Sequence, residues 1–400
     1  MTLSLSMIVR NEADRLAACL ESVRGFATEL VVLDTGSGDD TVAIAERCGA
    51  VVHQMAWPGD FAPARNEALR HVRGDWVLVL DADEQLLPEA RAPLRELMAR
   101  PELLLINLLR FEQGARQSPY SNVSRLFRRH PGIHWSRAYH AQVDDSVTAL
   151  LRAEPHWRVA DCPVPALVHD GYRPELLATG AKASRLRAAM EAELARRPGD
   201  PYACAKLGAL EVSEGNRERG LALLERGLAG CSDSAAPERL ELLQHLALAL
   251  SDQDPRRGIA LYREALTLTL PPRLSLAARL NLAQLLLAGG DGEGAGSLVA
   301  EACAVAPELA LVWFHRGAVE RQRGRLAEAI SAYRQAVALD PAAAEAHQNL
   351  AVCLLLGGDI HGARGGFSRA IALLHDQGRS EEAEALRGQA GSVVKLEPAG

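Results

Sequence analysis

Residues 77–86 read VLVLDADEQL, and this stretch decides how the rest of the chain is interpreted. Its first four residues are apolar and favour a buried β-strand, which leads directly into the acids Asp81, Asp83 and Glu84. Side chains at positions i and i+2 of an extended chain point to the same side, so Asp81 and Asp83 are expected to project together. Their charges repel unless a cation lies nearby. The stretch therefore predicts a strand that ends in an anionic site.

Two interpretations of this acid pair remain open on spacing alone. A hard divalent cation such as Mg²⁺ or Mn²⁺ binds carboxylate oxygens, and Mg²⁺ is typically held by one or two carboxylates together with waters and phosphates. The pair would then form a metal site for a diphosphate. Alternatively, the acids would form a solvated strand exit, or Asp83 would serve as the N-cap of a helix, because residues 83–98 (DEQLLPEARAPLRELM) have a helical pattern.

The sequence around this stretch is typical of an α/β unit with a mostly parallel sheet, because short β-like runs alternate with helical patterns up to about residue 110. The predicted strands are residues 3–9, 30–33, 50–53, 76–80 and 103–109. The predicted helices are residues 11–23, 41–48 and 66–71. Ligands of such sheets bind beyond the carboxyl ends of the strands. The loops at residues 10–12, 34–40 and 81–84 are therefore the expected site.

The loop at residues 34–41 (DTGSGDDT) is rich in glycine and precedes a helix, as in dinucleotide-binding folds. However, Thr41 stands where a third glycine is required, and the acids of the loop would repel a pyrophosphate on the helix N-terminus. This excludes a Rossmann dehydrogenase. Asp34 follows a strand and suits hydrogen bonds from a base N–H or a ribose hydroxyl. Asp39 or Asp40 is expected to cap the next helix.

Composition limits the class of protein further. The 400 residues are 48% hydrophobic with a net charge of -7, which favours a globular chain of two or three domains and argues against nucleic-acid binding. Seven dispersed cysteines without a CxxC pair indicate reduced thiols, with no disulfide and no zinc site. We expect no signal peptide and no transmembrane segment, hence a cytoplasmic protein, with peripheral contact at the inner membrane face as an alternative.

The second half of the chain contains an internal repeat. Small residues recur every 34 residues at Ala283, Gly317 and Ala351, and aromatic or branched residues keep the same step at Val299, Tyr333 and Phe367. This pattern resembles the tetratricopeptide repeat. We predict a helical connector at residues 181–200, five repeats over residues 201–375 with the first two degenerate, and a C-terminal helix and tail at residues 376–400. The concave surface of such an array takes a peptide or partner protein, and homodimer formation is the competing use.

Five segments in the first half resemble, in order and spacing, family 2 glycosyltransferases of the GT-A fold. They are LSMIVRNEADRLAACLESV, ELVVLDTGSGDDTVAIAERCGA, GDFAPARNEALRHVRGDWVLVLDADEQL, SRLFRRHPGIHWSRAYHAQV and the interdomain segment that begins LVHDGYRPELL. The branch with C-terminal tetratricopeptide repeats is most similar, and it includes lipopolysaccharide-core β-glucosyltransferases and bacterial peptide or protein glycosyltransferases. The resemblance implies an α/β GT-A domain (a nucleotide-diphospho-sugar transferase) at residues 1–180, followed by an all-α tetratricopeptide solenoid.

The resemblance also implies roles for individual residues. Asn11 and Glu12 match the loop that lines the nucleotide pocket, and Asp34 matches the acid that contacts the nucleoside. Arg65 matches a basic residue near the diphosphate, where its guanidinium can pair with phosphate.

Asp81 and Asp83 match the DxD motif that binds Mn²⁺ or Mg²⁺, with Asp83 as the more direct ligand. The metal would neutralise the leaving nucleoside diphosphate. His169 matches a further position of the branch, where it would either ligate the metal or form a structural hydrogen bond.

The general base of an inverting transfer is not assigned by the resemblance. Related proteins read His-Glu after the RLFRR segment, whereas this chain has Ala141 after His140. The candidates are therefore His140, Asp144, Asp145 and Glu84.

The arginines of the RLFRR segment, Arg125, Arg128 and Arg129, would either grip phosphates or coat a solvated strand edge. Zinc binding by His130 and His134 is not expected, because Pro131 and Gly132 break the helix that the spacing would need.

The sequence thus predicts a metal-dependent inverting glycosyltransferase that moves a sugar from a nucleotide donor, a UDP-sugar, to a polypeptide acceptor. An acceptor in the lipopolysaccharide core or another glycan is the alternative. A tetratricopeptide scaffold with a catalytically impaired GT-A domain is the alternative from another class of protein, motivated by Ala141.

Overall fold

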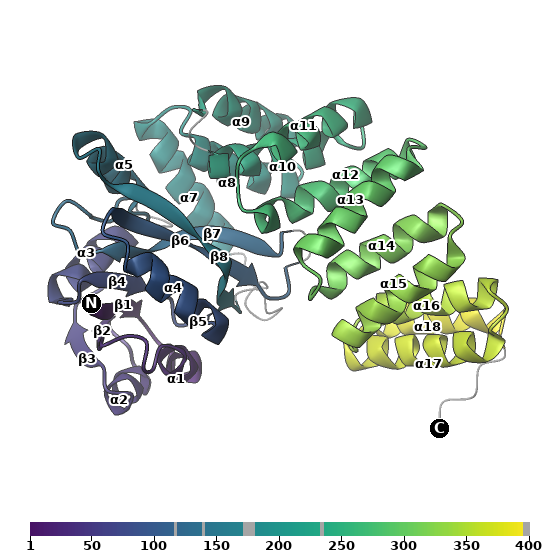
Figure 1. The fold of residues 1–400 in the computed structure, drawn as a ribbon, viewed down its shortest axis with the longest axis horizontal. Helices are drawn as coiled ribbons and strands as arrows, with labels where there is room; N and C mark the ends of the chain where they lie inside the picture. The colour runs from purple at the N-terminus through teal and green to yellow at the C-terminus, as the bar shows by residue number, and fades with distance from the viewer. Residues whose placement is uncertain (116–117, 138–140, 171–180, 233–235, 395–400) are drawn as a thin grey trace. The chain divides into compact units, whose positions relative to one another are not determined.

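The computed structural model describes residues 1–115, 118–137, 141–170, 181–232 and 236–394. The chain forms two compact units, Met1–Leu242 and Leu243–Gly400. The first unit contains an α/β sheet and the first repeat helices, and the second contains helices (Figure 1). The predicted fold class, an α/β domain followed by a helical repeat array, is confirmed. The predicted boundaries at residues 180, 200 and 375 stay predictions.

One half of the eight-stranded sheet is parallel, as predicted. Its strands lie in the order β3-β2-β1-β4. They are β1 (Leu3–Val9), β2 (Glu29–Asp34), β3 (Val51–Gln54) and β4 (Trp76–Val79). The runs that form β1, β2 and β4 lie in the buried part of the sheet, where Trp76 and Leu78 are fully buried, whereas β3 is the exposed edge strand.

The other half makes the sheet mixed, which corrects the expectation of a mostly parallel sheet. Its strands are β5 (Glu84–Leu86), β6 (Leu103–Glu112), β7 (Tyr120–Arg128) and β8 (Arg158–His169). They continue the sheet in the order β7-β6-β8-β5, and β7 is antiparallel to both β4 and β6. A short connection between β6 and β7 permits only an antiparallel return. The predicted strand at residues 103–109 corresponds to β6, whereas β5, β7 and β8 were not predicted.

Five helices pack on the sheet. They are α1 (Ala13–Ser22), α2 (Thr41–Arg47), α3 (Phe61–His71), α4 (Arg91–Met98) and α5 (Asp144–Ala153). In α1, the predicted stripe of Leu16, Cys19 and Leu20 is buried. Helix α3 begins earlier than predicted, because the side chain of Asp60 caps it by accepting a hydrogen bond from Ala62 N at 2.8 Å.

The prediction of one helix over residues 83–98, capped by Asp83, is wrong. Residues Glu84–Leu86 form β5, which pairs with β8, and a 3₁₀ turn at Pro88–Ala90 precedes α4. Pro88 disfavours the helical conformation of the residue before it, so no helix can start at Asp83 and run through this segment. Of the two acids expected to cap α2, Asp39 makes the side-chain bond, from Thr41 N at 3.1 Å.

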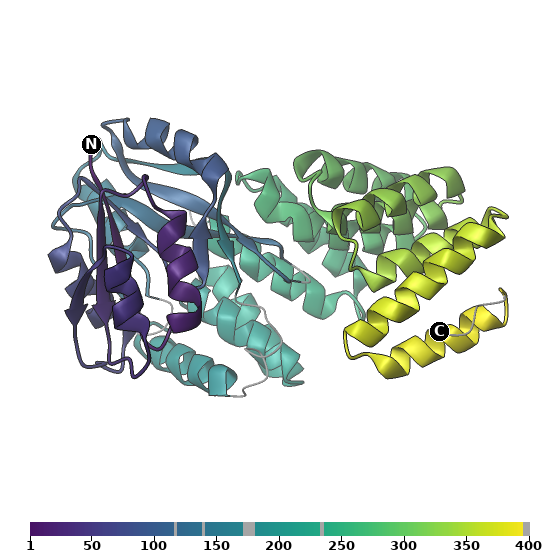
Figure 2. The same ribbon diagram turned by 90° about the horizontal axis from the view of Figure 1, so that it is seen from below.

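Paired antiparallel helices form the rest of the chain (Figure 2). The first unit contains α7 (Ala181–Arg196), α8 (Pro201–Ser213) and α9 (Arg217–Gly230), and α10 (Ala236–Leu250) spans the boundary between the units. In the second unit they are α11 (Pro255–Thr267), α12 (Leu276–Ala288), α13 (Gly292–Val305), α14 (Ala310–Gln322), α15 (Leu326–Leu339), α16 (Ala344–Leu356), α17 (Ile360–Asp376) and α18 (Ser380–Gly391), with a 3₁₀ turn at Pro272–Ser275. No helix among the described residues has the length and apolar character needed to cross a membrane.

The 34-residue period has the predicted packing role. Ala295, Ala329 and Ala363 are each fully buried in the second helix of successive pairs. Gly317 of α14 lies directly under the ring of Tyr333 in α15. Small residues at these positions let the two helices of a pair approach closely.

We expect Gly317→Ala to destabilise the repeat array by about 1–3 kcal/mol, the usual cost of overpacking a core. A Cβ at residue 317 would lie 2.8 Å from three ring atoms of Tyr333, which is itself fully buried. The matched control is Gly365→Ala in α17, where a Cβ meets no atom within 4 Å. That change should stabilise the helix by roughly 0.5–1 kcal/mol through helix propensity alone. Urea unfolding followed by circular dichroism measures both, and equal effects of the two changes would contradict the packing role.

Candidate active site

The carboxylate of Asp81, just after β4, forms ion pairs with two arginines. Its Oδ1 accepts a hydrogen bond from Arg65 Nη2 at 2.6 Å, and its Oδ2 accepts one from Arg125 Nη2 at 2.8 Å. Arg65 comes from α3 and is buried, and Arg125 comes from β7 and is only 13% exposed. Burial opposes ionisation of Asp81, but the two guanidinium groups outweigh it and hold its pKa far below the usual range. Asp81 is therefore a stable anion with both oxygens engaged.

Asp83 has different neighbours from those of Asp81. Its Oδ2 lies 3.4 Å from Nη1 of Arg15 in α1 and 3.5 Å from Nε2 of His169 at the end of β8. Among the described residues, no hydrogen bond reaches the other oxygen, Oδ1. Asp83 is thus held in place while one of its oxygens stays available.

Glu84 is fully buried beneath the acid pair. Its Oε2 accepts a hydrogen bond from Asp81 N at 2.9 Å, and its Oε1 accepts one from Arg110 Nη1 at 2.5 Å. Arg125 Nη1 lies 3.7 Å from the same carboxylate. Glu84 is therefore placed to fix the turn at the end of β4, and this environment does not suit a general base.

His169 joins β8 to the same cluster. Its Nδ1 lies 2.6 Å from Oε2 of Glu112, the last residue of β6. Burial opposes protonation of His169, but the hydrogen bonds to Asp83 and Glu112 outweigh it and raise its pKa to about 9. Burial likewise opposes ionisation of Glu112, but His169, Arg110 and the Ser121 hydroxyl lower its pKa to about 2. The pair is therefore an imidazolium and a carboxylate at neutral pH.

The charges of the whole cluster balance. Among the residues that the structure describes, five carboxylates face five cations, with Glu12 in contact with Arg15 at 2.7 Å. The carboxylates are those of Glu12, Asp81, Asp83, Glu84 and Glu112, and the cations are Arg15, Arg65, Arg110, Arg125 and protonated His169. The cluster as it stands carries no net charge.

The loops after β1 and β2 interlock beside this cluster. Asp34 is buried and accepts hydrogen bonds from Gly36 N at 3.1 Å and from Ser37 Oγ at 2.5 Å. Asn11 has a left-handed backbone with φ of 55°, donates from its N–H to Ser37 Oγ, and accepts from Gly38 N at 2.8 Å.

The next residue, Glu12, donates from its backbone N–H to Thr41 Oγ1 at 2.8 Å. Burial raises the pKa of the Glu12 carboxyl, and the neighbouring Arg15 partly offsets this rise. The structure therefore brings together Asn11, Glu12 and Asp34, as the sequence predicted for a strand-end site.

The candidate bases have separate environments. Asp144 accepts a hydrogen bond from Ser124 Oγ at 2.7 Å, and burial raises its pKa. Burial also opposes ionisation of Asp145, but Arg137, Ser136 and Arg197 outweigh it and lower its pKa. His140 lies outside the described residues.

A β-bulge in β7 lies between Asp81 and Asp144 and supplies a contact to each of them. The register of β6 and β7 shifts between Ile106 and Leu108, so that Ser124 and Arg125 both lie opposite Asn107. Consecutive residues of one strand thus contact Asp144 and Asp81.

Sequence reasoning missed several members of the cluster. Arg15, Arg110 and Glu112 were not predicted, although the polar end of the run at residues 103–112 was a usable signal. Of the two interpretations of Arg125, the solvated strand edge is wrong, because the side chain is only 13% exposed and pairs with Asp81. Among the described residues, no group of three or more His, Cys, Asp or Glu side chains is arranged to hold a metal ion.

Comparison with known proteins supports the interpretation of both halves. Residues 4–159 match the family described as Glycosyl transferase family 2. Residues 245–310 and 317–357 match families described as Tetratricopeptide repeat and TPR repeat. A TPR repeat-containing protein from Synechococcus elongatus is 42% identical over 384 residues, which are 96% of this chain and 95% of that protein.

Other relatives cover the N-terminal half. An uncharacterized glycosyltransferase from Rickettsia felis is 32% identical over 32% of this chain and 48% of its own length. The SPbeta prophage-derived glycosyltransferase SunS from Bacillus subtilis is 26% identical over 43% of this chain and 40% of its own length.

Two solved structures of repeat proteins match about half of the chain. MamA from Desulfovibrio magneticus is 21% identical over 50% of this chain and 99% of its own, with a TM-score of 0.37. YrrB, a TPR protein with an unusual peptide-binding site, is 17% identical over 49% of this chain and 98% of its own, with a TM-score of 0.37.

The α/β domain is that of a glycosyltransferase. The chain belongs with the TPR repeat-containing proteins, and its residues 4–159 are a glycosyl transferase family 2 domain in front of the repeats.

The ion pair of His169 with Glu112 predicts a loss of stability at alkaline pH. A histidine whose pKa rises from 6.5 to about 9 on folding stabilises the folded state fully below pH 6.5, and loses this contribution as the pH rises to about 9. We therefore expect the free energy of unfolding to fall over this interval in the presence of EDTA. His169→Gln should remove the dependence.

Urea unfolding followed by tryptophan fluorescence measures this effect, because four of the five tryptophans lie in the first unit. His134→Gln is the matched control, since His134 is exposed and should leave the wild-type profile unchanged. A His169→Gln profile with the wild-type slope would contradict the assignment.

Proposed function

We propose that this protein transfers a sugar with inversion from a UDP-sugar to a polypeptide acceptor, with the help of Mn²⁺ or Mg²⁺. The observation that carries the proposal is the acid pair Asp81 and Asp83 at the end of β4, next to the interlocked loop of Asp34. Asn11, Glu12 and Asp34 would contact the nucleoside, and the acid pair would face the diphosphate.

The charge balance of the cluster favours a divalent cation. Because the side chains already neutralise one another, an incoming diphosphate adds negative charge that they do not offset. Asp83 fits a metal ligand, since its Oδ1 is available and Mg²⁺ needs only one or two carboxylates. Asp81 fits less well as a direct ligand, because arginines occupy both of its oxygens. A bound Mn²⁺ or Mg²⁺ would supply Lewis-acid stabilisation of the leaving diphosphate.

The role proposed for His169 follows from the same contacts. Its two nitrogens already face Glu112 and Asp83. Because both nitrogens have carboxylate partners, we assign His169 the structural alternative of orienting Asp83.

Arg65 supplies a second argument for a phosphate ligand. Its Nη2 binds Asp81, whereas its Nη1 is buried and makes no hydrogen bond within the described part of the chain. An unused guanidinium donor beside an acid pair is suited to a phosphate oxygen. Arg65 would therefore orient Asp81 and bind the donor at the same time.

Asp144 is the best candidate for the general base among the described residues. Its raised pKa makes it a stronger proton acceptor than an ordinary aspartate. Asp145 is less suitable because Arg137 and Arg197 hold it ionised, and Glu84 because it is fully buried in ion pairs. Asp144 would deprotonate the acceptor hydroxyl or thiol as the sugar is transferred.

A test of the donor site is Asp83→Asn. We expect transfer to fall by at least roughly 100-fold, since a metal supplies several kcal/mol of transition-state stabilisation. The Mn²⁺-dependent rise in melting temperature with a UDP-sugar should also disappear. Asp161→Asn on β8 is the matched control, because Asp161 is exposed and should leave both properties unchanged.

Two outcomes would contradict the proposal. Full transfer by Asp83→Asn would exclude the metal role of this residue. Binding of no nucleotide sugar by the wild-type protein would favour the scaffold with an impaired catalytic domain.

The acceptor is tested by incubation with radiolabelled UDP-sugars and Mn²⁺, offered either host lysate protein or truncated lipopolysaccharide. We expect the label in protein, because a tetratricopeptide array provides a concave surface suited to polypeptides. Label found only in lipid would replace the polypeptide acceptor with the lipopolysaccharide core.

A further inference from the structure

Arg137 connects the catalytic domain to the first repeat. Its Nη1 and Nη2 donate hydrogen bonds to the two oxygens of Asp200 at 3.1 and 3.3 Å. Asp200 is the N-cap of α8, where it also accepts from Ala203 N at 2.9 Å. The Arg137 guanidinium lies over the ring of Tyr202, 5.2 Å from its centroid. A single side chain therefore contacts both the N-cap residue and the second residue of the first repeat helix.

The backbone of Arg137 has an unusual conformation. Its φ is 73°, and the only other described non-glycine residue with positive φ is Asn11 in the nucleotide loop. A left-handed conformation at a residue other than glycine or asparagine costs about 1–3 kcal/mol. A glycine would adopt this backbone conformation without the steric cost. The contacts of the Arg137 side chain must therefore offset the cost.

Arg137 also reaches the first turn of α5. Its Nη2 lies 3.7 Å from Oδ1 of Asp145, and Arg197 Nη1 lies 3.2 Å from Oδ2 of the same carboxylate. Arg197 directly follows α7, so two arginines join Asp145 to the helices behind the catalytic domain. Asp145 is adjacent to Asp144, the proposed base.

A second repeat helix also approaches this region. Glu238 lies in the first turn of α10, and its pKa is raised by burial and then by the negative charge of Asp144. Glu238 of α10 thus lies near Asp144.

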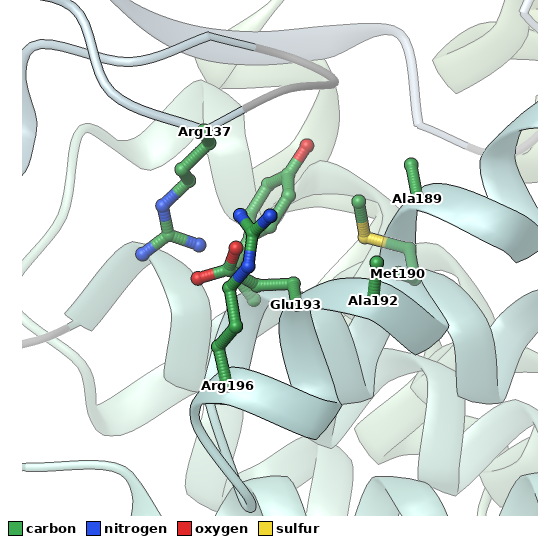
Figure 3. A pocket seen from close by; sticks show the side chains of 7 residues that line it. Arg137, Ala189, Met190, Ala192, Glu193 and Arg196 are labelled. Carbon is green, nitrogen blue, oxygen red and sulfur yellow. The ribbon is translucent and has the colours of Figure 1, made fainter.

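A small cavity lies between Arg137, α7 and the start of α8 (Figure 3). Its volume is about 40 Å³, and Arg137, Met190, Glu193, Arg196 and Tyr202 are among the residues that line it. Figure 3 shows the side chains of Arg137 and Glu193 facing the same space. This volume has room for ordered water but not for a sugar, so the cavity is not an acceptor subsite.

We propose that Arg137 is a positioning residue for the transfer reaction. Held by Asp200 at the N-terminus of α8, it fixes Asp145 and the first turn of α5, so that the first repeat completes the acceptor side of the catalytic site. The proposal rests on the role proposed above for Asp144. It makes the first repeat part of the enzyme's catalytic machinery, in addition to any part it has in partner binding.

Asp200→Asn in the full-length protein separates the two functions of Asp200. Asparagine remains a good N-cap for α8, but it lacks the charge that holds Arg137. We expect amide hydrogen exchange in residues 142–153, followed by mass spectrometry, to become about tenfold faster. Arg137→Gln and Arg137→Gly should have the same effect, and the double variant Arg137→Gln/Asp200→Asn should be no worse than either single change.

The catalytic readout is turnover of UDP-glucose, UDP-galactose or UDP-N-acetylglucosamine with Mn²⁺. We expect kcat to fall by about tenfold in Asp200→Asn while the donor KM and the affinity for UDP stay unchanged, because the affected aspartates lie on the acceptor side. A purely structural role would not separate kcat from KM in this way.

The matched control is Asp359→Asn. Asp359 caps α17 in the same manner, accepting from Gly362 N at 2.8 Å, and no ion pair of Asp359 is found among the described residues. It should change neither exchange in residues 142–153 nor kcat.

Unchanged exchange in Asp200→Asn, an equal change in Asp359→Asn, or faster exchange with unchanged kcat would each overturn the positioning role. If the wild-type protein turns over no UDP-sugar, the proposed function fails, whereas the exchange experiment still decides whether Arg137 anchors α5.

Discussion

The structure of the site depends on how Asp81 is neutralised. A carboxylate at the end of a buried strand is costly unless cations and hydrogen bonds surround it. Arg65 and Arg125 meet this need from α3 and β7, which are far apart in the sequence. Each arginine bonds a different oxygen of Asp81, so the two ion pairs fix the positions of α3 and β7 relative to β4. Stability of the domain and orientation of the site thus arise from the same contacts.

The fold was largely predictable from local patterns. Alternation of apolar runs and helical patterns located β1 to β4, and the stripe of Leu16, Cys19 and Leu20 located α1. The 34-residue period located the repeat helices, as the buried Ala329 and the contact of Gly317 with Tyr333 confirm. These signals succeed because each reflects packing of residues close in sequence.

The site was less predictable, because its contacts depend on the order of strands in the sheet. Glu84 meets Arg110 only because β5 pairs with β8 and β8 lies beside β6. Arg125 points at Asp81 through a bulge that no local pattern indicated. Likewise, Arg137 and Asp200 are separated by 63 positions and meet through the packing of α8 against the catalytic domain. Family resemblance named the acids Asp81 and Asp83 together with Arg65 and His169, but it did not name Arg15 or Arg110.

The boundary between the two compact units has a consequence for how such proteins diversify. It falls at Leu242 within α10, well beyond the end of the sheet, so the first repeat groups with the catalytic domain. A recombination event that exchanged repeat arrays at the end of the sheet would remove Asp200, the partner of Arg137, and Arg197, a partner of Asp145. Repeat arrays can therefore be exchanged without losing the contacts of Arg137 and Asp145 only downstream of the first repeat. Lineages of this architecture should vary in the number of distal repeats while inheriting the proximal one together with the enzyme.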